Sequence, residues 1–243
     1  MVAEEYERMA GVEETMWWYY GLHSIVIGAM RRTGTALPNV LDAGCGTGGT
    51  LKAIAREFPN ANLHGLDISG QACDFTHTKT GAAVSEGSVA SLPYAEKSFD
   101  VLVSCDVLEY PMNVNAAVAE AYRVLRPGGI CMINLAAYQW LYSYHDKAVG
   151  QVRRYTRTEA EALFREQGFE IVHSTYWNAL LFPLMVLKRK VLKAPLGSDV
   201  APFNPILNLI FKAFLQFEMR FIENVCPLPF GGSVFLVCRR PAP

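Results

Sequence analysis

Three glycines and an aspartate early in the chain have the spacing of a ligand-binding turn. The stretch VLDAGCGTGG (40–49) places Gly44, Gly46 and Gly48 between an apolar run and a segment with helical spacing. Glycines let the backbone turn tightly and let a ligand approach the main chain, and the N–H groups that start the next helix can bind a carboxylate or another anion. Asp42, two residues before the first glycine, could meet a positively charged group. The stretch therefore predicts a site for a charged ligand.

Asp67 is placed to bind the ribose of such a ligand. It ends the apolar part of GLDIS, twenty-three residues after Gly44. A carboxylate at this place can accept hydrogen bonds from both ribose hydroxyls. Gly44, Gly46 and Gly49 also satisfy G-x-G-x-x-G, so an NAD(P)-dependent oxidoreductase is the alternative interpretation. Asp42 and the extra glycine at 48 count against this alternative.

A second group of residues that could do chemistry lies in YHDKAVGQVRRY (144–155). A histidine near neutral pKa can remove a proton from an acceptor, which makes His145 the candidate general base. Asp146 or another acid could fix its tautomer. The arginines and tyrosine that follow could bind an anionic or phenolic group. The alternative is that the histidine is structural and the arginines form a solvated face.

The elements that must position these residues alternate from about residue 38 to 136. Helical spacing is found in Thr50–Phe58 and in Asn113–Leu125, where Asn113 is the expected N-cap. Strands alternating with helices predict a parallel, doubly wound sheet. Five short apolar runs are the expected strands: 39–44, 62–68, 82–87, 99–105 and 128–135.

After residue 136 the pattern changes. Aromatic residues at 138, 140, 142 and 144 alternate as on one side of an extended segment. Thr158 and Glu161 have capping-box spacing for a helix ending at Gly168, and residues 169–177 and 233–240 read as a sixth and a seventh strand. In residues 203–225 one narrow polar stripe runs along an otherwise apolar helix, which predicts that most of that helix is covered.

Composition excludes several classes of protein. The net charge is -1, so no global field attracts nucleic acid. Six scattered cysteines without a Cys-x-x-Cys pair argue against a zinc site or a disulfide framework, and no metal site is expected. The acidic N-terminus does not resemble a signal peptide. The apolar run ALLFPLMVL stops at Lys188, too short for a membrane span. A cytoplasmic protein is expected, with weak membrane-surface association through basic, apolar residues 184–193 as a possibility.

The chain resembles class I S-adenosylmethionine-dependent methyltransferases, most closely the small-molecule branch similar to ubiquinone-biosynthesis methyltransferases. Four successive motifs over roughly residues 38–136 carry the resemblance: VLDAGCGTGG, GLDIS, GSVASLPYAEKSFDVLVSCDVLEY and AYRVLRPGGICMINL. The resemblance implies S-adenosyl-L-methionine as the cofactor, with its methionine part at Asp42 and the glycine turn, its ribose at Asp67 and its adenine against Ile68 and Val89. The family often has Asp-Ala where this chain has Ser88 and Val89, so a hydroxyl or water contact to the adenine is expected instead. The cofactor-binding residues so implied are Asp42, Gly44, Cys45, Gly46, Gly48, Asp67, Ile68, Ser88, Val89 and Cys105.

Segments outside the cofactor core are expected to form the acceptor side. All four tryptophans lie outside the five-strand core, and ligands bind at the carboxyl ends of parallel strands. The predicted architecture is an α/β Rossmann-like seven-stranded sheet with a helical insert before the last strand. Residues 1–36 form an N-terminal helical lid, and 37–243 form the methyltransferase domain with substrate-side inserts at about 137–157 and 178–230. The predicted substrate-binding residues are Trp18, Tyr20, Trp140, Tyr144, Arg153, Arg154 and Tyr155.

These features predict methyl transfer to a small, apolar or aromatic acceptor. O-methylation is slightly favoured over C- or N-methylation, because a histidine base beside an Arg/Tyr cluster suits a hydroxyl or carboxylate. Besides the oxidoreductase, the other alternative is a catalytically silent binding subunit on this fold. The sequence does not determine the oligomeric state.

Overall fold

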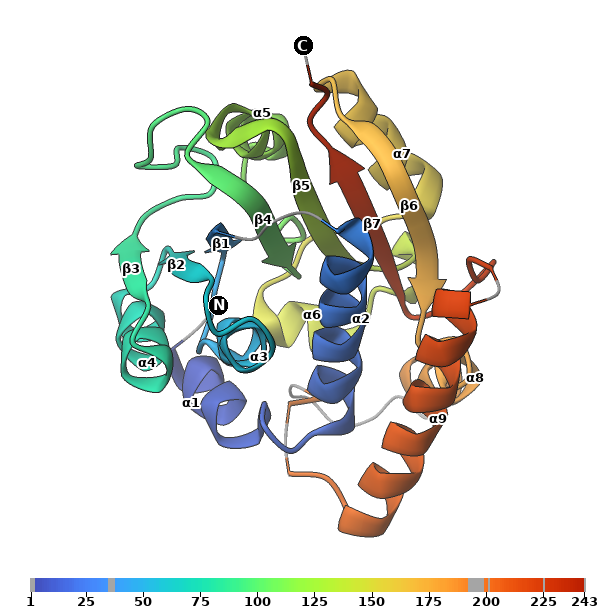
Figure 1. Cartoon of the computed structure of the whole chain (residues 1–243). Helices are drawn as coiled ribbons and strands as arrows, with labels where there is room; N and C mark the ends of the chain where they lie inside the picture. Colours follow the sequence, from blue (N-terminus) through green and yellow to red (C-terminus); the bar gives the residue numbers. More distant parts are fainter. Residues whose placement is uncertain (1–2, 35–37, 192–198, 201, 225, 243) are drawn as a thin grey trace.

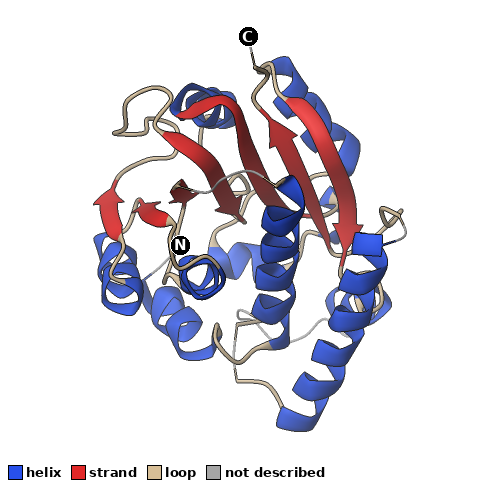
Figure 2. Cartoon of the chain, in the orientation of Figure 1, coloured by secondary structure: helices blue, strands red, loops and turns tan. Residues whose placement is uncertain are grey.

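The strands predicted from apolar runs assemble into one sheet. The structure is a computed structural model and describes residues 3–34, 38–191, 199–200, 202–224 and 226–242. These residues form a seven-stranded sheet in the order β3-β2-β1-β4-β5-β7-β6, covered by helices on both faces (Figures 1 and 2). The first five strands are parallel, and β7 runs antiparallel to both β5 and β6. The strands are β1 (Asn39–Ala43), β2 (Asn62–Asp67), β3 (Ala83–Glu86), β4 (Phe99–Cys105), β5 (Leu125–Ala136), β6 (Glu170–Trp177) and β7 (Ser233–Arg239).

Alternating side chains of the strands bury two cores, one on each face of the sheet. Val101 and Val103 pack with α2, α3 and α9 on one face, and Leu102 packs with α5 and α7 on the other. Figure 1 shows α2 and α3 in front of the sheet and α5 and α7 behind it. The helices are α1 (Ala3–Val12), α2 (Trp17–Thr33), α3 (Gly49–Glu57), α4 (Gly70–Thr80), α5 (Val114–Val124), α6 (Tyr144–Val149), α7 (Arg157–Glu166), α8 (Phe182–Val186) and α9 (Pro205–Asn224), with short η1 (Gln139–Leu141) and η2 (Leu187–Val191).

The predicted fold class is confirmed, and several local predictions are accurate. The N-cap of α5 is Asn113, whose side chain accepts a hydrogen bond from the Ala116 N–H at 3.1 Å. The strand predicted from residue 128 begins three residues earlier, at Leu125, so that Pro127, Gly128 and Gly129 lie within β5. The predicted boundary between residues 36 and 37 lies outside the described residues. The C-terminal ends of the predicted segments 184–193 and 203–225 also lie outside them.

Two local predictions between residues 138 and 161 are wrong. The capping box of α7 is formed by Thr156 and Glu159, two residues earlier in the chain than the predicted pair. The aromatic segment that begins at Tyr138 is not extended, because Tyr138 has a φ of 60° and the chain then turns through η1 into α6. Its alternating side chains therefore point to different partners: Tyr138 stacks on Tyr176, whereas the Tyr142 hydroxyl donates to the carbonyl of Gln151 at 2.9 Å.

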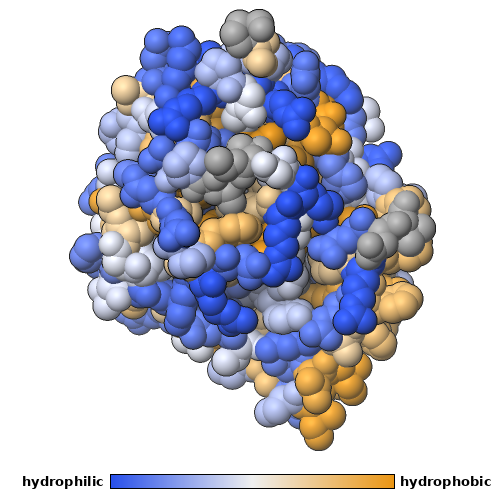
Figure 3. Space-filling view, viewed as in Figure 1, coloured by the Kyte–Doolittle hydropathy of each residue, from blue (hydrophilic) through white to orange (hydrophobic). Residues whose placement is uncertain are grey.

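Helix α9 is much less covered than its sequence predicts. Its buried contacts to the sheet and α2 come from Leu215, Met219 and Ile222. Gly21 of α2 allows this approach, since a Cβ there would lie 2.6 Å from Leu215 Cδ1. Most of the other apolar side chains face outward, and apolar surface gathers over the lower end of α9 in Figure 3. The exposed ones are Ile206, Leu207, Leu209, Ile210, Phe214, Phe217 and Phe221.

Within the described part of the chain, no helix is long and apolar enough to cross a bilayer. Association with a membrane surface stays a prediction, and the exposed apolar face of α9 is compatible with it. An apolar face on a surface helix suits the boundary between lipid headgroups and acyl chains.

Candidate active site

A cavity of about 920 Å³ lies at the carboxyl ends of the parallel strands. Its floor is formed by residues at or just after the ends of β1, β2, β4 and β5, and its walls come from α1, α2, α6, α8 and α9. One side is polar and includes the glycine turn. Other parts of the wall are rich in large apolar side chains, namely Met16, Trp17, Trp18, Leu22, Leu181, Leu184, Met185, Phe203 and Phe211.

The glycine turn is folded tightly over the end of β2. The N–H of Gly44 donates to the carbonyl of Leu66 at 2.7 Å. Gly44 has a φ of 88°, and a Cβ at this position would lie 2.3 Å from Val107 Cγ2. A larger residue would be both strained and in collision, which explains the glycine. The turn thereby presents its main chain to the cavity.

Asp67 ties this turn to β2 and to the N-terminal helix. Its Oδ2 accepts a hydrogen bond from the Gly46 N–H at 2.9 Å, and its Oδ1 accepts from the Ser69 N–H and the Tyr6 hydroxyl, both at 3.1 Å. Burial and then the charge of Asp67 raise the pKa of Tyr6, so this hydroxyl stays protonated and donates. Helix α1 therefore lies against the predicted cofactor site, and its role as a lid stays a prediction.

Asp42 faces the cavity from the end of β1 as a buried acid. Burial, and next the charge of Asp67, raise the pKa of its carboxyl to about 7. Close by in the turn, Thr47 Oγ1 is buried and has no hydrogen-bond partner among the described residues. A buried carboxylate is stabilised by a cation. Asp42 and Thr47 can therefore hold a positively charged, hydrogen-bonding group.

The first N–H of helix α3 is not open to a ligand, which corrects the sequence prediction. The Gly49 N–H donates to Glu13 Oε2 at 3.1 Å, and Glu13 forms an ion pair with Lys79. The anion predicted at this helix N-terminus is therefore a side chain of the protein itself.

The residues predicted to hold the adenine lie together on the cavity wall. Ile68 is 71% exposed, so its apolar surface is available for a planar ring. Val89 packs on the core behind it, and Ser88 Oγ accepts the Ala90 N–H at 3.2 Å. Of the ten predicted cofactor residues, nine line the cavity, and Gly48 lies behind them with its backbone turned at a φ of 87°.

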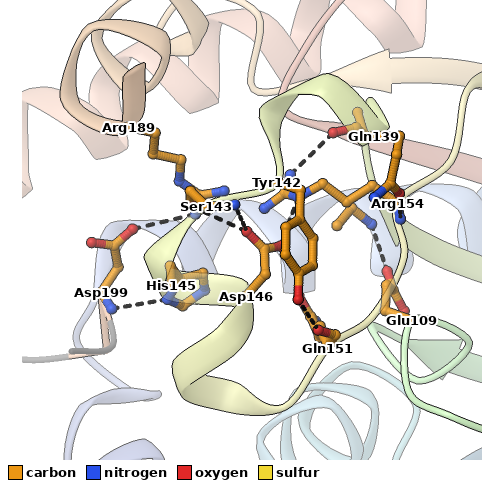
Figure 4. Close-up of polar contacts among 12 residues, drawn as sticks. Glu109, Gln139, Tyr142, Ser143, His145, Asp146, Gln151, Arg154, Arg189 and Asp199 are labelled. Atoms are coloured by element: carbon orange, nitrogen blue, oxygen red, sulfur yellow. Dashed lines mark hydrogen bonds and ion pairs between the residues drawn. The ribbon is translucent and has the colours of Figure 1, made fainter. Parts of the chain in front are cut away.

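His145 lies on the polar wall, at the start of α6. Its Nδ1 accepts a hydrogen bond from the backbone N–H of Asp199 at 2.9 Å (Figure 4). Burial and then the charge of Arg189 lower the pKa of His145 to about 4, so the ring is neutral near pH 7. A neutral ring that accepts at Nδ1 carries its proton on Nε2. His145 thus offers a hydrogen-bond donor at Nε2.

Asp146 is directed away from the role predicted for it. Its Oδ1 accepts from Arg154 Nε at 2.6 Å, and its Oδ2 accepts from the Ser143 N–H at 2.8 Å (Figure 4). The carboxylate is fully buried. It caps α6 and neutralises Arg154, and the main chain of Asp199, rather than Asp146, fixes the tautomer of His145.

Two acids that sequence reasoning missed follow β4. Asp106 lines the cavity with a φ of 57°, and both its oxygens accept from Asn134 Nδ2, at 3.1 and 3.0 Å. Trp177 Nε1 donates to Asn134 Oδ1 at 2.7 Å, which orients the amide. Burial raises the pKa of Asp106 to about 7, and it raises the pKa of Glu109 well above its usual range. Asp106 is therefore a carboxyl that can gain and lose a proton near neutral pH.

Only two of the seven predicted substrate-binding residues line the cavity, Trp18 and Arg154. The others have partners elsewhere. Tyr155 donates to the carbonyl of Leu108 at 2.8 Å in the core, and Tyr144 donates to Asp199 Oδ1 at 3.0 Å. Trp140 is 53% exposed on the outside. Tyr20 accepts from Gln216 Nε2 at 2.6 Å, and Arg153 is likewise absent from the lining residues.

Several residues of the cavity had a weak signal in the sequence or none. Asp106 directly follows a predicted strand, where a parallel sheet places ligand contacts, so this position could have been found. Tyr6, Arg189 and Asp199 reach the cavity from distant segments without any motif. Among the described residues, no group of three or more His, Cys, Asp or Glu could hold a metal ion.

The fold is a Rossmann-like domain, and its cavity presents acids suited to a ribose and to a cationic group. Residues 41–133 match the family described as Methyltransferase domain. A sterol 24-C-methyltransferase from Pneumocystis carinii is 31% identical over 184 residues, which are 67% of this chain and 47% of that protein. A 2-methyl-6-phytyl-1,4-hydroquinone methyltransferase from Oryza sativa is 37% identical over 98 residues, 39% of this chain and 30% of that protein. The chain spans less than half the length of these curated relatives.

Solved structures share the whole fold at low sequence identity. A chain from the Haloferax volcanii complex of the Trm112 methyltransferase activator with a methyltransferase has a TM-score of 0.66 at 18% identity, over 99% of this chain and 100% of that chain. Phosphoethanolamine N-methyltransferase 2 from Haemonchus contortus, solved with S-adenosyl-L-methionine, has a TM-score of 0.58 at 18% identity, over 88% of this chain and 52% of that one. These matches identify residues 41–133 as a methyltransferase domain, and together with the shared fold they support a class I S-adenosylmethionine-dependent methyltransferase. These similarities favour that class over the oxidoreductase alternative.

Proposed function

We propose that this chain transfers a methyl group from S-adenosylmethionine to a small, apolar acceptor inside the cavity. The observation that carries the proposal is the cavity itself. It joins the glycine turn and Asp67 to a wall of tryptophan, phenylalanine and methionine. A donor and an acceptor bound on these two walls would be held next to each other, and such positioning contributes a large part of methyl-transfer catalysis.

The residues present fit the cofactor. Asp42 supplies a buried negative charge for the amino group of the methionine part, and Thr47 supplies an unpaired hydroxyl. Asp67 supplies carboxylate oxygens for the ribose, although Tyr6 shares one of them. Ile68 supplies an exposed apolar face for the adenine. When bound, the cofactor supplies the electrophilic methyl group.

An apolar or aromatic acceptor is supported by the apolar part of the wall. Trp17 meets Phe203 and Phe211 edge to face, with ring centroids 6.4 and 5.4 Å apart. Burying an apolar acceptor against such rings is favourable in proportion to the area removed from water. The sterol and hydroquinone methyltransferases that this chain resembles are named for acceptors of this kind.

O-methylation remains the favoured reaction, but with a changed assignment of roles. Methyl transfer to a hydroxyl oxygen requires a group that takes the hydroxyl proton. A carboxylate with a pKa near 7 is suited to this at neutral pH. Asp106 has such a pKa and faces the cavity. His145 can take a proton only after its contact with Asp199 opens, because Nδ1 is already engaged. We therefore assign proton removal to Asp106. We assign to His145 Nε2 a hydrogen bond that it donates to the acceptor oxygen.

The function is tested by methyl transfer from radiolabelled S-adenosylmethionine to a panel of long-chain phenols, hydroquinones and sterols. Extraction into organic solvent separates the methylated product. Thermal shift with S-adenosylhomocysteine and NADH in parallel tests the class of ligand. Stabilisation by NADH alone would contradict the proposal, and cofactor binding without turnover of any acceptor class would favour the silent binding subunit.

Cofactor affinity is expected to depend on pH through Asp42. Its pKa of about 7 means that the carboxyl becomes protonated as the pH falls below 7 and no longer pairs with an ammonium group. The dissociation constant of S-adenosylhomocysteine should therefore rise between pH 8 and 5.5, by up to about tenfold per pH unit below the pKa. Isothermal titration over this range measures the effect.

Asp42→Asn provides the control for this pH dependence. It should bind weakly at every pH and remove the slope between pH 8 and 5.5. The same carboxyl also affects stability without ligand. Because its folded pKa lies above its unfolded value, the free energy of unfolding should fall as the pH rises from about 4 through about 7. A pH slope that is unchanged in Asp42→Asn would assign the titration to another group.

A further inference from the structure

Arg189 carries hydrogen-bond donors that no group in the described residues uses. Its side chain is only 8% exposed and lines the cavity from η2. Nη2 donates to Asp199 Oδ2 at 3.2 Å, whereas Nε and Nη1 are buried and have no partner in the described part of the chain. Buried donors without partners are costly and rare in folded proteins. A ligand in the cavity that accepts from this guanidinium would remove the cost.

The charges around Arg189 do not balance. Asp146 is paired with Arg154 at 2.6 Å. Asp199 is shared, with Lys188 at 2.7 Å and Arg189 at 3.2 Å. Three cationic side chains thus meet two carboxylates, while His145 is neutral near pH 7. The remaining positive charge on this wall calls for an anion.

The two acids that follow β4 interact with Arg154 and not with Arg189. Glu109 is held in its neutral form by burial, since its pKa lies well above the usual range. Asp106 is engaged by Asn134. Burial and next the charge of Arg154 lower the pKa of Arg189, and the charges of Asp199 and Asp146 offset this only in part.

Large apolar side chains adjoin Arg189 along the same wall. Leu184 and Met185 of α8 line the cavity one turn earlier in the chain. Leu184 is also 51% exposed, so the apolar lining continues to the molecular surface. A ligand with one anionic end and an apolar body would satisfy the guanidinium and cover the apolar wall at the same time.

We propose that Arg189 forms an anion-binding subsite, and that the acceptor of this enzyme carries a carboxylate or phosphate group on an apolar body. The planar guanidinium can donate two parallel hydrogen bonds to either group. The assignment of the bound molecule as the methyl acceptor rests on the proposed function. The binding of an amphipathic anion at Arg189 does not.

Binding of ten-carbon probes to the full chain, saturated with S-adenosylhomocysteine, tests the subsite. Decanoate, decyl phosphate and decanol share the apolar body and differ in the head group. The dissociation constant of each probe is measured from the quenching of tryptophan fluorescence, with the probes competing against one another. Wild type should bind at least one of the two anions about 10- to 100-fold more tightly than decanol. The ratio between decanoate and decyl phosphate identifies the preferred head group.

Arg189→Gln should remove this preference and leave the affinity for decanol within about twofold. Lys190→Gln is the matched control, because Lys190 is a neighbouring exposed cation that donates to the carbonyl of Tyr142 and does not line the cavity. That variant should keep the preference. Retained binding of S-adenosylhomocysteine shows that each variant is folded.

Three results would overturn the subsite: equal affinity of wild type for decanol and both anions, an anion preference that survives Arg189→Gln, or an equal loss in Lys190→Gln. If Arg189→Gln does not fold, the comparison of head groups on wild type still decides. Anion binding without methyl transfer to any acceptor would contradict the proposed function and leave the subsite in place.

Discussion

Asp106→Asn is expected to lower kcat about 10²- to 10⁴-fold, the contribution of a well-placed general base. Asparagine keeps the shape of the side chain and its contact with Asn134, but it cannot accept a proton. Burial sets the pKa of Asp106 at about 7, so wild-type activity should fall as the pH decreases through 7 and the carboxylate becomes protonated. The variant should lose this limb of the pH profile. Steady-state kinetics with the first acceptor found measures both effects.

His145→Gln separates the two candidates for the proton. If His145 only donates a hydrogen bond from Nε2, glutamine can replace it, and KM should change more than kcat. Asp100→Asn is the control for Asp106→Asn, because Asp100 lies at the opposite end of β4 and pairs with Arg126 at 2.7 Å. It should leave kcat unchanged. If His145→Gln lowered kcat by 10² or more while Asp106→Asn had a kcat near that of wild type, the general base would be His145.

Asp67→Ala is expected to raise the dissociation constant of S-adenosylhomocysteine at least about a hundredfold. Two ribose hydroxyls would donate to this carboxylate, and a hydrogen bond to a charged group contributes about 1.5–3 kcal/mol. The variant also removes the acceptor that holds the Gly46 N–H at 2.9 Å, which loosens the glycine turn. Both effects weaken cofactor binding. Isothermal titration measures the change.

Glu86→Ala is the matched control for Asp67→Ala. Glu86 ends the neighbouring strand β3, pairs in register with Asp67 and does not line the cavity. It should bind the cofactor product as wild type does. Asp67→Asn should fall between the two, since it keeps one acceptor oxygen. If Asp67→Ala bound S-adenosylhomocysteine normally while folded, the ribose would have to lie elsewhere and the cofactor site assigned by resemblance would be wrong.

The fold and the cofactor side were accessible from the sequence because their signals are local. Alternating valines and leucines determine which residues of β4 face each core. A strand, a glycine turn and a helix form one continuous motif, so Gly44 and Asp42 could be placed without knowledge of distant contacts. Asp67 followed because the carboxyl ends of parallel strands meet at one edge of the sheet.

The acceptor side was decided by the tertiary structure alone. The partner that fixes the His145 tautomer is Asp199, fifty-four residues away, and the hydroxyl that donates to Asp67 belongs to Tyr6, sixty-one residues away. The cluster at 144–155 divided into a buried ion pair whose Arg154 also lines the cavity, a core tyrosine and a cavity-facing histidine, which its sequence spacing did not reveal. No periodic pattern encodes such pairings, because they depend on how loops from separate crossovers pack above the sheet. For the same reason the sequence of α9 defined a helix, but only its contact with α2 and the sheet determined which of its apolar residues became buried.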